Sequence, residues 1–371
     1  MSEAPGGRDR GAGGPGPRLP LLACAIGSLV LGVLAGLLRA GVAVPVATGE
    51  HVAAHALLMI GGFFGTVVSL ERAVALGRGW ATAAPLASAL GAVALWVGAP
   101  AGWVAGLQLA AGAVLVAASV RLHRRQPQLH AQVLVVGAAC WPAGTLAWIA
   151  SGSVEAGIGL WISFLVVTIA GERLELSRFM PPAPAARRVF VGLLALVVIA
   201  SPGWGFAGAP ARVALGAGYL LLAGWLLRQD VARRTAREAG LTGFIGRALI
   251  SGYAWLAIGA LLTIAAALVP DPLRWDAALH ALLLGFVMAM VFGHAPIIFP
   301  AVIRVRMPFH PGFYVPLALL HASLVLRVAG GLAGAPQWRA WGAVGNAIAL
   351  ATFLASVAAS VWRGRRGRGR L

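Results

Sequence analysis

Long apolar runs follow one another along the whole chain, and a typical run is about twenty residues long. A helix of that length can cross the hydrocarbon layer of a bilayer, which is about 30 Å thick. The runs cover approximately residues 19–42, 51–71, 80–99, 102–120, 131–151, 154–171, 188–206, 210–227, 244–269, 276–303, 313–334 and 338–362. The loops between them are short, so no separate soluble domain fits anywhere. The pattern predicts an all-α, polytopic membrane helix bundle with about twelve transmembrane helices.

The two ends of the chain depart from this pattern. Residues 1–18 are rich in glycine and proline, and we expect them to be a disordered leader. Arginines before an apolar run resemble a signal peptide, but the run is too long for one, so a retained first helix is expected. Residues 19–362 are expected to form a single transmembrane domain, and residues 363–371 a basic cytoplasmic tail.

Charge is sparse and unevenly distributed. Of the 371 residues 60% are hydrophobic and 11% are charged, and all 29 basic residues are arginine. If the N-terminus is cytoplasmic, 24 arginines fall on the cytoplasmic side and five on the other. Those five are Arg39, Arg212, Arg274, Arg327 and Arg339. This follows the positive-inside rule, so both termini are predicted to be cytoplasmic.

The same distribution explains the formal net charge of +18 without a nucleic acid. The arginine-rich loops and tail are expected to meet the anionic lipid of the bilayer. We therefore expect no nucleic-acid partner, and a multi-pass location in the bacterial inner (cytoplasmic) membrane. Eight tryptophans are expected to form an interfacial belt at the outer helix ends: Trp96, Trp103, Trp148, Trp161, Trp204, Trp275, Trp338 and Trp341.

The second, sixth and tenth runs resemble one another weakly. FGTVVSLERAVALGR closes the second run and FLVVTIAGERLELSR the sixth, while the tenth shares HALL and a following GF with the second. A spacing of four runs suggests three four-helix units, although shared composition would produce the same likeness. The two Glu-Arg pairs are interpreted as local ion pairs at the inner boundary.

Two histidines head the repeated HALL, His55 in the second run and His280 in the tenth. Both runs cross from outside to inside, so the two side chains lie at matched depth in the outer leaflet. Two histidines placed in this way can serve as the axial ligands of one haem iron. At 100° per residue, Met59, Gly62, Thr66 and Ser69 follow His55 along one stripe. That stripe would suit either a porphyrin or an ordinary helix contact.

A second histidine pair is more distant. His294 follows His280 by 14 residues, or roughly 21 Å along the same helix face. Its one plausible partner is His321, at comparable depth in the inner leaflet. All four histidines are candidate metal ligands, so one haem is expected, or two if the second pair binds as well. For each histidine the alternative is a buried imidazole that donates to a backbone carbonyl.

Two arginines lie toward the outer ends of their helices, Arg39 in the first run and Arg327 in the eleventh. A charge at that depth needs a partner or must reach the interface. The anionic propionates of a haem would supply the partner. Arg39 and Arg327 are therefore candidate cofactor-binding residues, with snorkelling as the alternative.

Three stretches resemble the NnrS family: HALLMIGGF from His55, HALLLGFVMAMVFGH from His280, and LLHASLVLRVAG from Leu319. That family comprises twelve-helix membrane proteins containing haem and copper and linked to nitric-oxide metabolism. The resemblance implies haem near His55 and His280, and respiratory or denitrification partners. It also implies copper, for which the sequence offers no obvious site unless His51, Met59, Met288 or Met290 contributes.

A looser likeness to the haem-copper oxidase large subunit points to the same two histidines. The sixth and seventh runs lack histidine, however, so the oxidase copper site cannot be built and oxygen reduction is not expected.

The residues leave two further classes open. A cofactor-free secondary transporter also suits twelve helices, and Pro296 and Pro300 would break the tenth helix around its substrate. A scaffold for a respiratory complex is the third class. No P-loop or dinucleotide fingerprint occurs, which disfavours ATP-driven transport and NAD(P)H binding. Whether the protein is an enzyme is not decided by these patterns.

Overall fold

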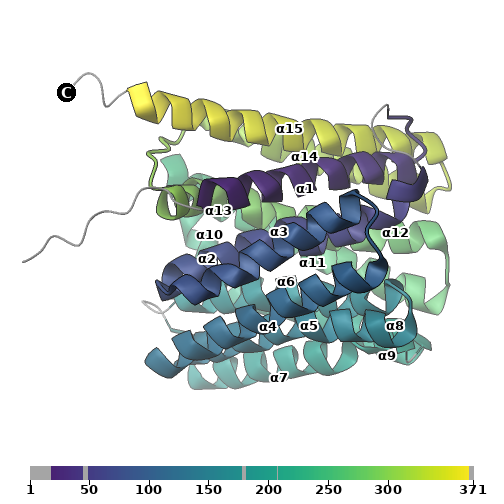
Figure 1. Cartoon of the computed structure of the whole chain (residues 1–371), viewed down its shortest axis with the longest axis horizontal. Helices are drawn as coiled ribbons and strands as arrows, with labels where there is room; N and C mark the ends of the chain where they lie inside the picture. The colour runs from purple at the N-terminus through teal and green to yellow at the C-terminus, as the bar shows by residue number, and fades with distance from the viewer. Residues whose placement is uncertain (1–17, 45–48, 178–180, 207, 367–371) are drawn as a thin grey trace, which may run out of the picture.

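The computed structural model of the chain describes residues 18–44, 49–177, 181–206 and 208–366. Within these ranges every regular element is a helix, and no strand occurs. The long helices lie alongside one another, roughly parallel or antiparallel, in one bundle (Figure 1). The predicted all-α class is confirmed. The expected leader, apart from Arg18, and the last five residues of the tail lie outside the described ranges.

Twelve segments of the described chain are long and apolar enough to cross a membrane, as the sequence predicts. They are α1 (Arg18–Arg39), η2 with α2 (Leu57–Gly65 and Thr66–Leu76), η3 with α3 (Gly79–Thr82 and Ala83–Trp96), α4 (Ala101–Arg125), α5 (Leu129–Ser151), α6 (Glu155–Leu176), α7 with α8 (Pro184–Ala200 and Gly203–Phe206), α9 (Gly208–Gln229), α11 (Gly240–Leu268), α12 with η5 and α13 (Pro272–His280, Ala281–Met288 and Ala289–Ile303), η6 with α14 (Pro311–Phe313 and Tyr314–Leu332) and α15 (Pro336–Arg366). Short helices η1 (Gly49–Ala54) and α10 (Ala232–Thr235) lie between them. The protein is a multi-pass membrane protein.

Several helices run beyond the apolar segments that predicted them, and two of these end in basic residues. Helix α4 continues to Arg125 and α15 to Arg366, and each has three basic residues in its last turn. Cationic side chains there favour the negative end of the helix dipole, so the helix extends past the hydrocarbon layer. The boundary expected after residue 362 therefore falls inside a continuous helix.

Three of the twelve segments form the interior of the bundle. The most apolar stretch of α6 is 83% buried, that of η2 with α2 is 72% buried and that of α12 with η5 and α13 is 67% buried. The other segments range from 33% to 50%, as expected for helices with one face toward lipid. The interior segments are the second, sixth and tenth, the ones whose sequences resemble one another. A division into three four-helix units stays a prediction.

The tryptophan belt is only partly as predicted. Trp103, Trp338 and Trp341 are exposed on the surface that would face lipid and headgroups. Trp148, Trp161 and Trp204 are instead buried. The Trp161 indole donates to the carbonyl of Trp141 at 3.2 Å, and the Trp204 ring packs edge-on against Trp275. These three rings fill space between helices because that end of the bundle is itself closely packed.

The first turn of α1 and the last turn of α15 lie at the same end of the bundle, on the left in Figure 1. An even number of crossings requires this arrangement. Helix α12 lies at the opposite end, together with the start of α15. The cytoplasmic location of the termini remains the prediction of the arginine count.

Candidate functional site

His55 and His280 lie next to each other inside the bundle. Their ring centroids are 6.1 Å apart, and the two ring planes differ by 23°. His55 is two residues before η2, and His280 is the last residue of α12. The structure thus brings together two residues that are 225 positions apart in the sequence.

Each of these two rings is held through its Nδ1 atom. His55 Nδ1 is 2.7 Å from the carbonyl oxygen of Gly32 on α1. His280 Nδ1 is 2.7 Å from the carbonyl oxygen of Asp276, one turn earlier in α12. A carbonyl oxygen can only accept, so Nδ1 carries the proton in each ring and Nε2 keeps its lone pair. Metal-binding histidines are oriented by the same type of contact.

A π-helix begins just after each of the two histidines. Leu57–Gly65 (η2) follows His55, and Ala281–Met288 (η5) follows His280. π-Helices are rare in proteins and are frequently found at functional sites. Both copies of HALL therefore share a backbone irregularity as well as a sequence. No sequence pattern considered above predicts it.

The two histidines line a cavity that is otherwise mostly apolar. The cavity has a volume of about 60 Å³. Its walls come from α1, η2, η5, α14 and α15, and include Gly36, Met59, Phe64, Leu284, Asn346 and Leu350. Val33, Leu37 and Ala347 also line it and are half-buried, so the mouth lies between α1 and α15.

Arg327 also lines the cavity, and its side chain is only 5% exposed. Its Nη2 is 3.1 Å from Asp276 Oδ1 and its Nε is 3.3 Å from Asp276 Oδ2. The charge therefore has a partner within the protein, on α12, and does not reach the interface by snorkelling. Arg39, at the end of α1, is exposed.

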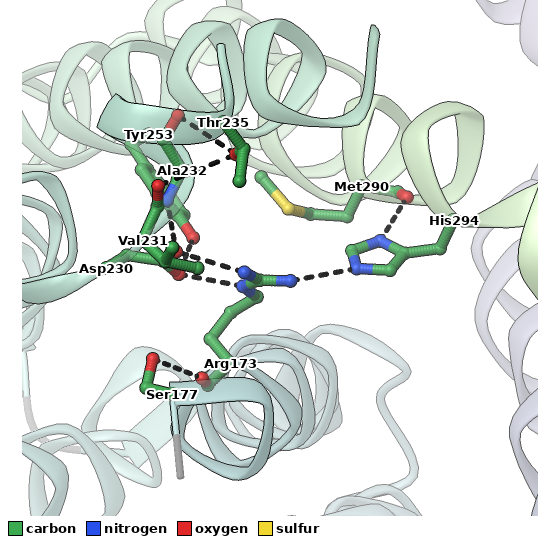
Figure 2. Close-up of polar contacts among 9 residues, drawn as sticks. All are labelled: Arg173, Ser177, Asp230, Val231, Ala232, Thr235, Tyr253, Met290 and His294. Carbon is green, nitrogen blue, oxygen red and sulfur yellow. Dashed lines mark hydrogen bonds and ion pairs between the residues drawn. The ribbon is translucent and has the colours of Figure 1, made fainter. Parts of the chain in front are cut away.

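His294 belongs to a different buried network (Figure 2). Its Nε2 accepts from Arg173 Nη1 at 3.2 Å, and its Nδ1 donates to the carbonyl of Met290 at 2.7 Å. Arg173 also makes two hydrogen bonds to Asp230, of 2.7 and 3.0 Å, and the Tyr253 hydroxyl donates to the same carboxylate at 2.6 Å. The network joins α6, the end of α9, α11 and α13. Arg173, predicted as half of a boundary Glu-Arg pair, binds Asp230 instead.

His321 is held by α11 and does not contact His294 in the hydrogen bonds that the structure shows. The Trp255 indole donates to its Nδ1 at 3.0 Å, and its Nε2 lies 2.9 Å from the Ser251 hydroxyl. Both nitrogens of His321 and both of His294 thus have protein partners. A second haem between these two residues stays a prediction. In the structure each of the two imidazoles is hydrogen-bonded to protein groups.

The stripe of small residues below His55 packs against other helices. Met59 touches Gly32 on α1, and a side chain at Gly62 would meet Ser28 on α1 and Ala92 on α3. Thr66 donates to Ser88 on α3 at 2.9 Å. Gly62 and Thr66 therefore make helix contacts, whereas Met59 also lines the cavity beside His55. The count of 100° per residue does not apply there, because a π-helix takes more residues per turn.

No cluster suited to a bare metal ion is evident in the described ranges, where no group of three or more His, Cys, Asp or Glu side chains gathers. Of the proposed copper ligands, Met288 and Met290 are buried in the core around η5 and α13. The copper prediction therefore gains no support from the arrangement of these side chains.

Sequence reasoning missed the acidic partners of the buried arginines. Asp230 directly follows α9, a position where aspartate is common for capping, and Asp276 lies within α12. Neither residue is close in sequence to the arginine that it binds: 51 positions separate Asp276 from Arg327 and 57 separate Asp230 from Arg173. A buried arginine requires an acidic partner, and this apolar chain has few acidic residues. That scarcity was the signal by which the two aspartates could have been found.

The comparison with known families gives one match, which covers nearly the whole bundle. A domain family of unknown function, DUF8744, matches residues 18–362, which is the entire bundle except the last turn of α15. The chain belongs to the DUF8744 family. No curated protein and no solved structure matches the chain.

Proposed function

We propose that this DUF8744 protein is a membrane haem protein in which His55 and His280 would hold one haem. The observation that carries the proposal is the pair of imidazoles with bound Nδ1 atoms and ring centroids 6.1 Å apart. A metal–imidazole bond is about 2.0–2.1 Å long, so two imidazoles on opposite sides of one metal ion have centroids about 6 Å apart.

The surroundings favour haem over a bare metal ion. Zinc and copper sites need more protein ligands than two histidines, and the described residues gather no group of three or more. A haem supplies four nitrogens of its own and needs an apolar space beside the ligands. The cavity between α1 and α15 is such a space, and outward movement of the half-buried Val33, Leu37 and Ala347 would widen it.

The protein's own groups define what such a site can do. Gly32 and Asp276 hold both rings with Nε2 free, and the apolar walls exclude water from the iron position. Haem bound there would supply one-electron redox chemistry. Haem held by both histidines would suit electron transfer.

The cellular setting is part of the same proposal. The resemblance of the HALL segments to the NnrS family supports nitric-oxide-related chemistry and a respiratory or denitrification partner. The arginine distribution supports insertion in a bacterial inner membrane with both termini in the cytoplasm.

The structure does not show the broken helix on which the transporter alternative was based. It required a break in the tenth segment at Pro296 and Pro300, but α13 continues through both prolines to Ile303. The irregular backbone lies earlier, in η5, directly after His280.

Absorption spectroscopy of the purified protein tests the proposal. We expect a Soret band and about one haem per chain. His55→Ala and His280→Ala should each abolish it, and the double substitution should be no worse, because two ligands of one iron act as a unit. His310→Ala, at an exposed histidine that caps η6, is the control and should keep full haem content. A colourless wild-type protein, or full haem in either single variant, would overturn the assignment.

A further inference from the structure

A buried glutamine on α4 has an oxygen atom that accepts no hydrogen bond. Gln108 is only 3% exposed, and its Oε1 has no hydrogen-bond partner among the residues that the structure describes. A buried acceptor without a donor is unfavourable, and the hydrocarbon around a membrane protein offers no water to replace the donor. The Oε1 atom therefore points to a partner that the side chains and backbone around it do not supply.

Two glycines make room for the Gln108 carboxamide. A β-carbon on Gly61 of η2 would lie 2.5 Å from Nε2 and 2.6 Å from Oε1 of this side chain. A β-carbon on Gly91 of α3 would lie 3.1 Å from the same Nε2. Alanine at Gly61 would displace the carboxamide, so the close fit of η2 around this polar group depends on glycine.

Gln108 lines a small cavity between η2, α4, α5 and α6, and this cavity is separate from the one that His55 and His280 line. Its volume is about 10 Å³. One water molecule needs a cavity of roughly 10–15 Å³, so this size limits a ligand to a single water-sized molecule. Ile60 lines both cavities, which therefore share one wall.

Thr145 on α5 lines the same small cavity and supplies a second acceptor. Its Oγ1 donates to the carbonyl of Trp141 at 3.2 Å, which uses its proton and leaves lone pairs on the oxygen. The Trp161 indole donates to the same carbonyl at 3.2 Å, so its proton is also used. A ligand with two donor hydrogens could satisfy both Gln108 Oε1 and Thr145 Oγ1.

We propose that Gln108 and Thr145 form a binding site for one water molecule beside η2. Water carries two donor hydrogens and is small enough for the cavity. A cation of similar size would bring a charge into apolar surroundings in which neither of these two side chains carries a compensating charge. The inference goes beyond the proposed function, because the site needs no haem.

Radiolytic labelling of the purified protein in detergent tests for this water. X-rays convert a bound water into a hydroxyl radical, which oxidises the side chains next to it, and mass spectrometry of the peptides measures the oxidation of each residue. In wild type we expect oxidation of Trp161, on the cavity wall, to exceed that of Phe190, which is 0% exposed, after correction for intrinsic reactivity.

Substitutions assign the water to its site. Gln108→Leu should remove the excess oxidation of Trp161, because an apolar cavity of this size stays dry. Thr145→Val, which keeps the side-chain shape, should reduce the oxidation and tests the site even if Gln108→Leu does not fold. Thr263→Val is the control and should leave it unchanged, since the buried Thr263 hydroxyl donates to Gly259 within α11.

Two results would overturn the inference. Oxidation of Trp161 no greater than that of Phe190 in wild type would show that no water is bound in the cavity. Oxidation that persists in both Gln108→Leu and Thr145→Val would show that these side chains do not hold the water. Neither result depends on haem content, so the haem assignment would stand or fall separately.

Discussion

At the scale of single residues, buried polar side chains of this protein lie next to one another in pairs. His55 and His280 each use one nitrogen for a backbone carbonyl, and they line the same cavity with ring centroids 6.1 Å apart. Arg173 and Asp230, only 4% and 2% exposed, bind each other within a hydrogen-bonded network. The first pair keeps unused lone pairs and is a candidate site. The second uses its hydrogen-bonding groups on protein partners, which is typical of a structural contact.

The buried ion pair yields a prediction about stability. Asp230→Ala leaves the Arg173 guanidinium buried and without its carboxylate, which should lower the free energy of unfolding by about 3–5 kcal/mol. The double variant Arg173→Met with Asp230→Ala should be more stable than Asp230→Ala alone, because no charge is then left unpaired. Thermal and denaturant unfolding in detergent, followed by circular dichroism, measures both.

A matched control is available at the other end of the bundle. Asp271 caps α12 by accepting from the backbone amides of Leu273 and Arg274, so Asp271→Ala should cost only about 1 kcal/mol. Equal losses for Asp230→Ala and Asp271→Ala would show that the Arg173–Asp230 pair is not specially important. Haem content should be unchanged in all of these variants, since the network is not part of the proposed site.

At the scale of elements, the π-helices decide where side chains on the two central segments point. In an α-helix His280 and His294 would share one face, but η5 separates them, and they meet His55 and Arg173 respectively. The wider turns are accompanied by glycines in close contact with bulky neighbours. Gly65 lies against Trp141 and Gly285 against Trp255. A π-turn and a missing side chain together allow the helices to approach there.

Gly285 offers a test of that packing. A β-carbon at this position would lie about 2.5 Å from the Trp255 ring, so Gly285→Ala should displace an indole that donates to His321. Overpacking of this kind costs about 1–3 kcal/mol. Gly106→Ala on the exposed face of α4, where a β-carbon meets nothing within 4 Å, should instead stabilise by about 0.5–1 kcal/mol. The melting temperatures of the two variants measure these effects. A shift in the same direction for both variants would contradict the predicted overpacking.

At the scale of the whole molecule, the burial of the membrane segments follows a regular order along the chain. The three interior segments are the second, sixth and tenth, so each is surrounded by neighbours from both sides of the sequence. The candidate site lies between two of them, at η2 and η5, and α1 and α15 line its mouth. The first and last helices of the chain therefore border a site whose two histidines lie near the starts of the second and tenth segments.

The direction of insertion can be tested independently of any cofactor. Reporter fusions after Arg125 and Arg237 should report cytoplasm, and fusions after Pro100 and Asp271 should report the opposite side, because arginine-rich loops stay inside. Alkaline phosphatase and a fluorescent protein are suitable reporters, since each is active on one side only. The reverse pattern at all four positions would place the histidine pair near the cytoplasmic face and refute the predicted topology.

The amino-acid sequence by itself determined the number, order and approximate limits of the membrane helices. A chain in lipid must satisfy its backbone hydrogen bonds within each segment, so local hydrophobicity and length are sufficient to locate a helix. The repeated HALL also singled out His55 and His280, because a histidine in an apolar run stands out without any knowledge of its neighbours. Only the tertiary structure decided the partners: Asp276 for Arg327, Asp230 for Arg173, and a π-turn after each HALL. Those choices depend on contacts between residues more than fifty positions apart and on how closely helices pack. Many apolar sequences share the same local pattern and differ in those contacts.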